Sequence, residues 1–314
     1  MLFRSDKCTV AEDTLCGGAA TSFDEVLTRN ALMRSYFDLI GHSVPLFMAL
    51  GNHDGESGTT TAGAQALSTW SLAARKHFYA NPEPDDFYRG NTTLSPDQGF
   101  RQNYYAFEWG DALFVVLDPY TYAVRKPRRG VDRDGWTWTL GETQYRWLVE
   151  TLAGSEARYK FVFSHHLLGG NGSEARGGAA FGSFFEWGGQ DLDGTWAFDR
   201  ERPGWGRPIR QLFSDYRVTA WFHGHDHFYA REQLDGTIYQ EVPQPSLDRY
   251  DMPNPAAGYG YLGAMGENQF ASSGHLRVTV SPTAVQVDYV RSVAPGDEVG
   301  TRRNRAILQS YTIR

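Results

Sequence analysis

The sequence predicts an α/β fold, because short apolar runs typical of strands alternate with segments typical of helices along its 314 residues. Three of the apolar runs end abruptly in polar clusters, and in open α/β sheets functional side chains gather beyond the carboxyl ends of the strands. With 41% hydrophobic and 21% charged residues, the composition is ordinary for a globular protein that buries a core. We therefore expect a single domain over residues 1–314.

The first part of the chain is predicted to hold two helices with a strand between them. Ser22 followed three residues later by Glu25 is a capping-box pattern, and helical spacing of apolar residues continues as far as Gly41. The apolar run 44–50 has the length and composition of a buried strand. A second helix is expected over about 62–79.

The middle of the chain predicts a hairpin, a helix and another buried strand. The runs 104–109 and 112–117 are separated by Gly-Asp, which suits a tight hairpin turn. Thr139 followed by Glu142 is a second capping-box pattern, so a helix is expected to begin there. The apolar run 159–164 is predicted to be a strand.

A long segment over residues 169–207 is dense in glycine and aromatic residues. A stretch of this length without predicted structure is usually functional or mobile. We expect a lid or a substrate-facing insertion, and a disordered excursion is the alternative. A short helix over 208–216 follows, and further strands are predicted over 218–222, 238–242, 275–280, 285–290 and 306–313.

Polar side chains follow three of the predicted strands, and they are the candidate site residues. They are Asn52, His53 and Asp54 after the first run, His165 and His166 after the second, and His223, His225 and His227 after the third. Side chains two apart in an extended segment point the same way, so the last three histidines are predicted to face one point. Neutral imidazole is a common ligand for zinc, iron and manganese, although surface histidines in a polar loop are the alternative for this stretch taken alone.

Three motifs in order resemble the signature of the calcineurin-like metallophosphoesterases. They are GNHD at 51–54, a strand ending in His165, and GHDH at 224–227. The resemblance implies a four-layer α/β/β/α sandwich. The family's first two motifs, Asp-x-His and Gly-Asp-x-x-Asp, do not occur before Val44. We therefore expect an N-terminally truncated member that lacks its first strands, and substitute ligands from residues 1–43 are the alternative.

The resemblance also implies a metal-dependent reaction, the hydrolysis of a phosphomonoester or phosphodiester by a metal-bound hydroxide. Family members use two ions, which activate water and clamp the phosphoryl oxygens. The matching residues imply that Asn52, His165 and His225 bind one ion and that His227 binds the other. His165 is favoured over His166, and His223 is expected to support a ligand or to be structural. The ions are divalent or trivalent, and manganese, zinc, iron and magnesium are not distinguished by the sequence.

His53 and Asp54 are the catalytic candidates that the resemblance implies. His53 would face the leaving group as an acid or a charge stabiliser, and Asp54 would hold the other ring nitrogen. Because the absent motifs normally supply a bridging carboxylate, the activity of this chain is doubtful. A catalytically inactive relative that binds a metal or an anion is therefore the alternative function.

The composition and charge exclude some classes of binding partner. A net charge of −7 argues against a broad nucleic-acid surface, and no apolar run approaches the roughly 20 residues of a membrane span. The expected substrate is a small-molecule, lipid or nucleotide phosphate ester. We expect no signal peptide at residues 1–7, which contain no apolar core region, and a secreted or periplasmic full-length form is one option for the compartment. Cys8 and Cys16 are either a disulfide or two thiols.

Overall fold

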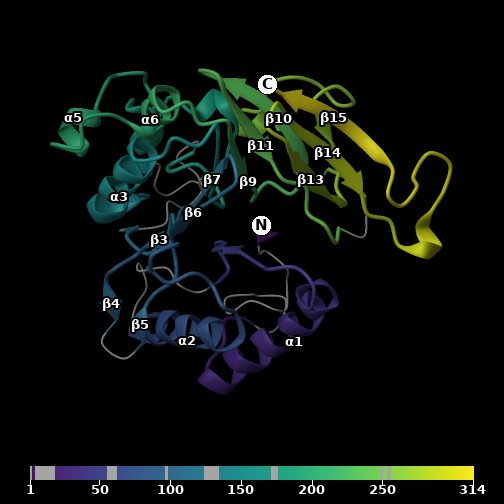
Figure 1. Ribbon diagram of the computed structural model, residues 1–314, viewed down its shortest axis with the longest axis horizontal. Coiled ribbons are helices and arrows are strands. Elements are labelled where there is room, and N and C mark those ends of the chain that lie inside the picture. The colour runs from purple at the N-terminus through teal and green to yellow at the C-terminus, as the bar shows by residue number, and fades with distance from the viewer. Residues whose placement is uncertain are drawn as a thin grey trace.

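The computed structural model describes residues 2–3, 18–54, 62–95, 98–123, 134–170, 176–247, 250–252 and 256–314. Its centre is an eight-stranded mixed sheet, in the order β12-β10-β11-β9-β8-β7-β6-β3 (Figure 1). The strands are β3 (Arg89–Gly90), β6 (Tyr105–Trp109), β7 (Ala112–Val116), β8 (Tyr159–Phe163), β9 (Ala220–His223), β10 (Tyr229–Leu234), β11 (Thr237–Glu241) and β12 (Gln269–Phe270). The predicted α/β class is confirmed.

The middle of this sheet is parallel and sets the position of the candidate site. Strands β7, β8, β9 and β11 all run in the same direction. In their register Val116 lies opposite Phe163, and Phe163 lies opposite Phe222. Because β8 and β9 end at the same edge, the polar residues that follow each of them emerge side by side.

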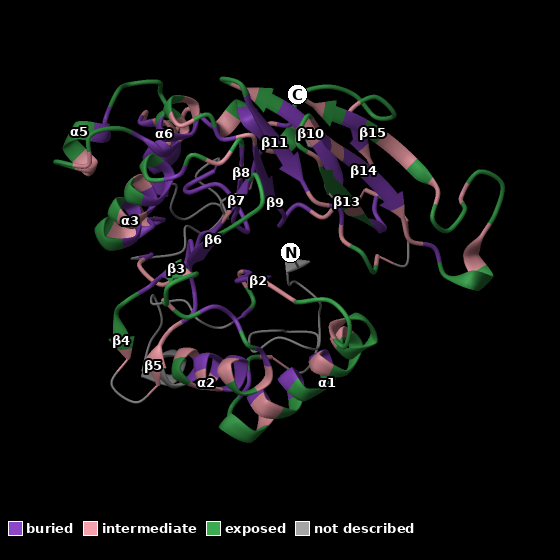
Figure 2. Ribbon diagram, in the orientation of Figure 1, coloured by how far each residue is buried: buried purple, intermediate pink, exposed green. Residues whose placement is uncertain are grey.

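Both faces of the central sheet are buried, as expected for parallel strands (Figure 2). On β7, Leu113 and Val115 belong to a cluster that includes side chains of two helices, whereas Ala112 and Val116 belong to a cluster on the opposite face. The helices are α3 (Gly141–Ala153) and α6 (Ile209–Asp215). Alternation along one strand therefore divides the protein into layers.

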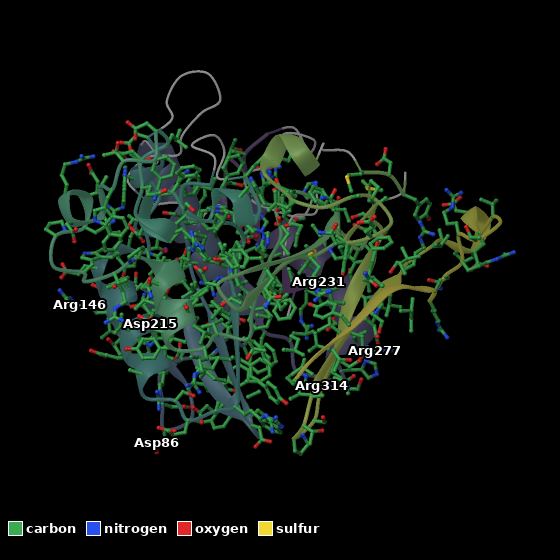
Figure 3. All side chains as sticks on the ribbon, turned by 90° about the horizontal axis from the view of Figure 1, so that it is seen from above. Asp86, Arg146, Asp215, Arg231, Arg277 and Arg314 are labelled. Carbon is green, nitrogen blue, oxygen red and sulfur yellow. The ribbon has the colours of Figure 1, made fainter. Side chains whose placement is uncertain are left out.

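The second face of the central sheet packs on a smaller antiparallel sheet, in the order β13-β14-β15. Its strands are β13 (Gly274–Val280), β14 (Val285–Arg291) and β15 (Ile307–Ile313). Tyr311 of β15 donates its hydroxyl to Oε1 of Gln240 on β11 at 2.9 Å. The guanidinium of Arg231 on β10, which is labelled in Figure 3, lies 4.2 Å from the centre of the same ring. A cation on a tyrosine face is attractive, so these contacts join the two sheets.

The N-terminal helices pack on each other beside the sheets (Figure 1). They are α1 (Phe23–Gly41) and α2 (Ala62–Phe78). Ser22 caps α1 as predicted and accepts the N–H of Glu25 at 3.2 Å. The Glu25 carboxylate accepts the N–H of Thr21 at 2.9 Å, one residue before the position that a capping box predicts.

The strand predicted over 44–50 is much shorter in the structure. Only β2 (Met48–Ala49) is extended and paired, and among the described residues it pairs with β1 (Leu2–Phe3) and stays outside the central sheet. Side chains take the place of a further strand. The N–H of Met48 is donated to Oδ1 of Asn81 at 3.2 Å, and its carbonyl accepts the hydroxyl of Tyr105 at 2.8 Å.

The segment 169–207 is described over 169–170 and 176–207, and the second of these parts is folded. Its elements are η3 (Ala179–Phe181), α4 (Phe185–Gly188) and α5 (Phe198–Glu201). Trp187 is buried in the cluster beneath α3 and α6 and donates its indole N–H to the hydroxyl of Tyr239 at 2.9 Å. That the segment covers a substrate stays a prediction.

Some local predictions need correction. α3 begins at Gly141 without a side-chain cap, because Thr139 accepts the N–H of Gly141 instead of capping the helix. The sequence analysis did not predict β10, because apolar and polar residues alternate only weakly along it. The remaining short elements are β4 (Leu94–Ser95), β5 (Gly99–Phe100), η2 (Gly135–Thr137), η4 (Ala256–Tyr259) and η5 (Pro295–Asp297).

Cys8 and Cys16 lie outside the described residues, so the structure does not test their pairing. None of the described helices is long and apolar enough to cross a membrane.

Candidate functional site

Three loops that are far apart in sequence meet at one edge of the central sheet. The first follows β2 and carries Asn52, the second follows β8 and carries His165, and the third follows β9 and carries His225. Oδ1 of Asn52 lies 2.9 Å from Nε2 of His165, and Nδ1 of His225 lies 3.2 Å from the same Nε2 atom. One oxygen and two ring nitrogens therefore converge on a single point.

Backbone hydrogen bonds place the two histidine loops against each other. The N–H of Ser164 is donated to the carbonyl of Phe222 at 3.2 Å, and the N–H of Gly224 is donated to the carbonyl of His165 at 3.0 Å. The indole N–H of Trp221 is donated to the Ser164 hydroxyl at 2.8 Å. The backbone pairing of β8 and β9 thus continues one step beyond the sheet, and it fixes the positions of His165 and His225 relative to each other.

His165 and His166 have different surroundings. Nδ1 of His166 lies 2.7 Å from the carbonyl oxygen of Leu167, and its ring meets the edges of Tyr120 and Trp138. His165 instead turns its Nε2 toward Asn52. This placement favours His165 over His166 as the residue that meets a ligand.

A tight turn positions Asn52 and His53 after β2. The N–H of Asp54 is donated to the carbonyl of Gly51 at 3.1 Å, and a buried carboxylate oxygen of Asp54 accepts the N–H of Gly51 at 2.5 Å. His53 lies exposed at the tip of the turn. The described role of Asp54 is therefore to close this turn, while its predicted contact with the ring of His53 stays a prediction.

His223 is the last residue of β9, and the three alternate histidines do not face one point, which corrects the expectation drawn from their spacing. His225 and His227 have φ angles of 85° and 66°, so the loop is not extended and the rule of alternation fails there. Ring nitrogen Nδ1 of His223 lies 2.8 Å from Oε2 of Glu241, and its ring stacks on Trp221. His227 is half-buried and lines the same cavity as His165 and His225.

A buried polar network holds the loop that carries His225. Glu241 accepts the N–H of Asp226 at 3.0 Å. The hydroxyl of Tyr261 lies 2.9 Å from Oδ2 of Asp226 and 3.2 Å from Oε2 of Glu241. Arg176 donates to Oδ1 of Asp226 at 2.7 Å and to the carbonyl of His225 at 3.2 Å. Two residues with left-handed backbone would be strained without such support.

Burial controls the charges at the site. It lowers the pKa of His165 and of His225 well below the ordinary value, and neighbouring histidines and Arg176 lower both further. Both imidazoles are therefore neutral near pH 7, which is the form that ligates metal ions. Burial also raises the pKa of Glu241 well above its ordinary value, and the nearby Asp226 reinforces this shift.

A family model described as calcineurin-like phosphoesterase matches residues 13–229 of the 314 residues. The chain belongs to the calcineurin-like phosphoesterase family. The match includes all three motifs, so the resemblance is confirmed. Metal-dependent hydrolysis of phosphate esters is the activity that this family suggests.

The chain is also similar to solved structures. The structure of PhoD aligns with 95% of this chain at 15% identity and a TM-score of 0.58, which shows a shared fold. A purple acid phosphatase, PPD1 from yellow lupin (Lupinus luteus) seeds, aligns with 92% at 15% identity and a TM-score of 0.49. The chain spans 60% of the PhoD structure's length and 44% of that of the purple acid phosphatase. A comparison with curated proteins gave no match.

The donor atoms at the site suit the metal chemistry of calcineurin-like phosphoesterases in part. A carboxamide oxygen and two neutral imidazole nitrogens are a ligand set for borderline divalent ions. Here Nε2 of His165 lies 2.9 Å from the carboxamide oxygen of Asn52 and 3.2 Å from Nδ1 of His225. Across the described parts of the chain, no group of three or more His, Cys, Asp or Glu side chains is placed to hold an ion. Asn52, His165 and His225 are the described residues that could hold part of the coordination shell of one ion.

The sequence analysis missed the residues that support the site. Each of them lies at least 15 residues from Asp226 in the chain, and no motif marks them. They are Glu241, Tyr261 and Arg176. A possible signal was Glu241 itself, because a glutamate at the end of a predicted buried strand requires a polar partner.

Tyr261→Phe is expected to lower the free energy of unfolding by about 1.5–3 kcal/mol, because it removes a donor from the buried Asp226 carboxylate. Tyr239→Phe is the matched control. It removes the neutral hydrogen bond with Trp187 from an equally buried tyrosine, and a loss of about 0.5–1.5 kcal/mol is expected. Urea unfolding measures both, and equal losses would contradict a charged partner for Tyr261.

Proposed function

We propose that this chain hydrolyses a phosphate ester at a metal ion held by Asn52, His165 and His225. The observation that supports this is the convergence of one carboxamide oxygen and two ring nitrogens at the edge of the sheet. When bound, such an ion supplies an activated water and a positive charge for the phosphoryl oxygens. The residues around it then orient the ester and move protons.

His53 is proposed to protonate the leaving group. It is exposed and lies next to Asn52 on the turn that Asp54 closes, so its ring can reach an ester bound over the three donor atoms. A positioned acid of this kind typically contributes about 10²–10⁴-fold to the rate. His227 is proposed as a ligand of a second ion, because it lines the same cavity as His165 and His225.

The protonation states of the ligands support this proposal. If His165 and His225 were cationic they would repel an ion, but their burial holds them neutral. With Nε2 protonated, His165 donates to Oδ1 of Asn52. A proton and a metal ion therefore compete for the same point.

The test is hydrolysis of an alkyl phosphate ester, whose alkoxide leaving group requires a proton, with added manganese or zinc. Chelator-sensitive turnover is expected, and His53→Ala should lower kcat by about 10²–10⁴-fold while bound metal is unchanged. His42→Ala is the control, since His42 is an exposed histidine at the end of α1. A variant His53→Ala with full activity would contradict the assignment.

A second function, binding of a metal or an anion without catalysis, is favoured by one observation. The three converging donors include no carboxylate, whereas two-metal hydrolysis requires ligands for a second ion. The same experiment separates the two functions. Metal bound in stoichiometric amount without any turnover would identify a binding protein.

A further inference from the structure

Residues 176–181, which we call the strap, lie against the loop that carries His225. Arg176 donates from one nitrogen, Nη1, to the carbonyl of His225 at 3.2 Å and to Oδ1 of Asp226 at 2.7 Å. The N–H of Gly177 is donated to Oδ2 of Asp226 at 3.2 Å. Because the Asp226 carboxylate is buried, the strap is a direct partner of the backbone and of a side chain beside a proposed metal ligand.

The strap is also fixed to a second loop, residues 259–262, and to a strand of the central sheet. The N–H of Gly178 is donated to the carbonyl of Tyr259 at 3.1 Å, and the N–H of Ala179 is donated to Oε2 of Glu232 on β10 at 2.9 Å. A Cβ atom at Gly178 would collide with the Glu232 carboxylate. The absence of a side chain therefore allows the strap to dock this closely.

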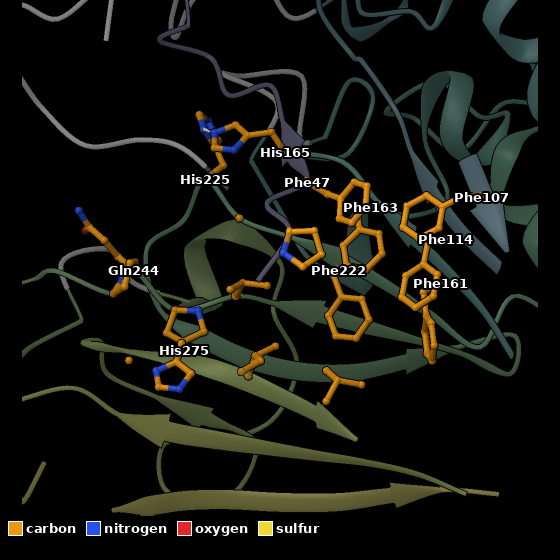
Figure 4. A pocket seen from close by; sticks show the side chains of 18 of the residues that line it. Phe47, Phe107, Phe114, Phe161, Phe163, His165, Phe222, His225, Gln244 and His275 are labelled. Atoms are coloured by element: carbon orange, nitrogen blue, oxygen red, sulfur yellow. Dashed lines mark hydrogen bonds between the residues drawn. The ribbon is translucent and has the colours of Figure 1, made fainter. Parts of the chain in front are cut away.

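The loop beyond β9 requires support because its backbone is left-handed at two residues that are not glycine. The φ angles are 85° at His225 and 66° at His227, and such residues persist where surrounding contacts hold them. Without the strap, the His225 carbonyl and the Asp226 carboxylate lose donors, and the loop can relax. Relaxation would move Nδ1 of His225 from its place 3.2 Å from Nε2 of His165 (Figure 4).

We propose that Arg176 and Asp226 are positioning residues that couple docking of the strap to binding of a metal ion at His225. This inference rests on the proposed function, because it takes His225 as a ligand. An ion that requires the aligned histidines binds the docked state in preference to the released one. The coupling is reciprocal, so the docked strap raises the affinity for the ion and the ion stabilises the docked strap by the same factor.

Arg176→Ala is expected to lower the affinity for zinc about 10–100-fold, the usual range for loss of a residue that supports a metal ligand. Arg176→Lys keeps a cationic donor for Asp226 and is expected to recover part of this loss. Titration of zinc against a chelating indicator dye measures the dissociation constants without any need for turnover. An unchanged dissociation constant for Arg176→Ala would overturn the proposal.

Arg210→Ala is the matched control. Arg210 also ties the segment 169–207 to a carboxylate, because it donates to the Ser183 hydroxyl at 2.8 Å and to Asp235 at 2.5 Å. Its side chain is 28% exposed, against 19% for Arg176, but its partners lie outside the loop that carries His225. Its replacement is expected to leave the zinc affinity unchanged. Equal losses for the two variants would show a general loosening of the segment and would also overturn the proposal.

Hydrogen exchange tests the reverse direction in the unchanged protein. Saturating zinc is expected to slow the exchange of the strap amides about 10–100-fold, because the coupling acts equally in both directions. The amide of Gly188 on α4 is the control, since it lies in the same segment but is bonded to the carbonyl of Phe184 at 3.0 Å. Strap exchange that zinc does not change would overturn the coupling even if no variant folds.

The failures of the two proposals are distinguishable. Zinc that slows strap exchange without hydrolysis of any ester would contradict the proposed function and leave the coupling in place. Zinc-dependent hydrolysis with unchanged strap exchange would contradict the coupling alone. A protein that binds no zinc would contradict both.

Discussion

His225→Ala is expected to lower the affinity of the chain for manganese or zinc by at least about 100-fold. Loss of a residue that only supports a ligand already costs about 10–100-fold, and His225 is one of three proposed direct donors. We expect at most one tightly held ion per chain in the unchanged protein, and less than a tenth of that in the variant. Elemental analysis after dialysis measures both quantities.

His275→Ala is the matched control for this variant. His275 lines the same cavity, but it is exposed and lies on β13, away from His165 and His225 (Figure 4). Its replacement should leave the bound metal unchanged. Retention of a full equivalent of metal by His225→Ala would contradict the proposed ligand set.

Arg202→Ala is expected to lower the free energy of unfolding by about 3–5 kcal/mol. Arg202 donates to the fully buried Glu186 at 2.5 Å and to the carbonyl of Trp136 at 2.6 Å. Without Arg202 the Glu186 carboxylate would be left buried and uncompensated, which is strongly destabilising. Thermal and urea unfolding measure the loss.

The pH dependence of this loss has a definite sign. Burial raises the pKa of Glu186 above its usual value of 4.5, and Arg202 opposes the shift, so its removal should raise the pKa further. The folded variant then holds a proton that the unfolded chain releases. Its stability should therefore fall as pH rises above about 4.5, and the deficit should be smaller in acid.

Arg200→Ala is the control for Arg202→Ala. Arg200 lies on the short helix α5, which ends just before Arg202, but its side chain is 63% exposed and pairs with Asp191 and Glu201 at the surface. Exposed pairs contribute about 0–1 kcal/mol. Equal losses for the two arginines would show that Glu186 tolerates its charge without a partner.

The strong local signals in the sequence predicted most of the fold. The apolar run 159–164 became β8, and Ser22 caps α1, because burial and capping act over a few residues. The run 44–50 gave only two strand residues, since a strand also requires a partner, and Asn81 and Tyr105 supply side-chain partners instead. The pattern of neighbouring residues does not predict hydrogen-bond partners that are distant in the chain.

The candidate site was predictable in its chemistry and less so in its geometry. The types and order of Asn52, His165 and His225 indicated a metal site, and the structure brings these three together. The rule of alternation placed His223 with them, but the left-handed backbone at His225 turns the loop, and His223 meets Glu241 instead. A φ angle of this kind in a residue other than glycine leaves no mark in composition.

The central strands lie between two apolar layers, and this limits how the chain can change in length. Inserting one residue into β8 would exchange the two faces of Phe161 and Val162 and carry His165 away from Asn52. Insertions and deletions among natural variants should therefore avoid β7, β8 and β9. They should gather at surface turns such as the one between β10 and β11, where Gly236 has open space around it.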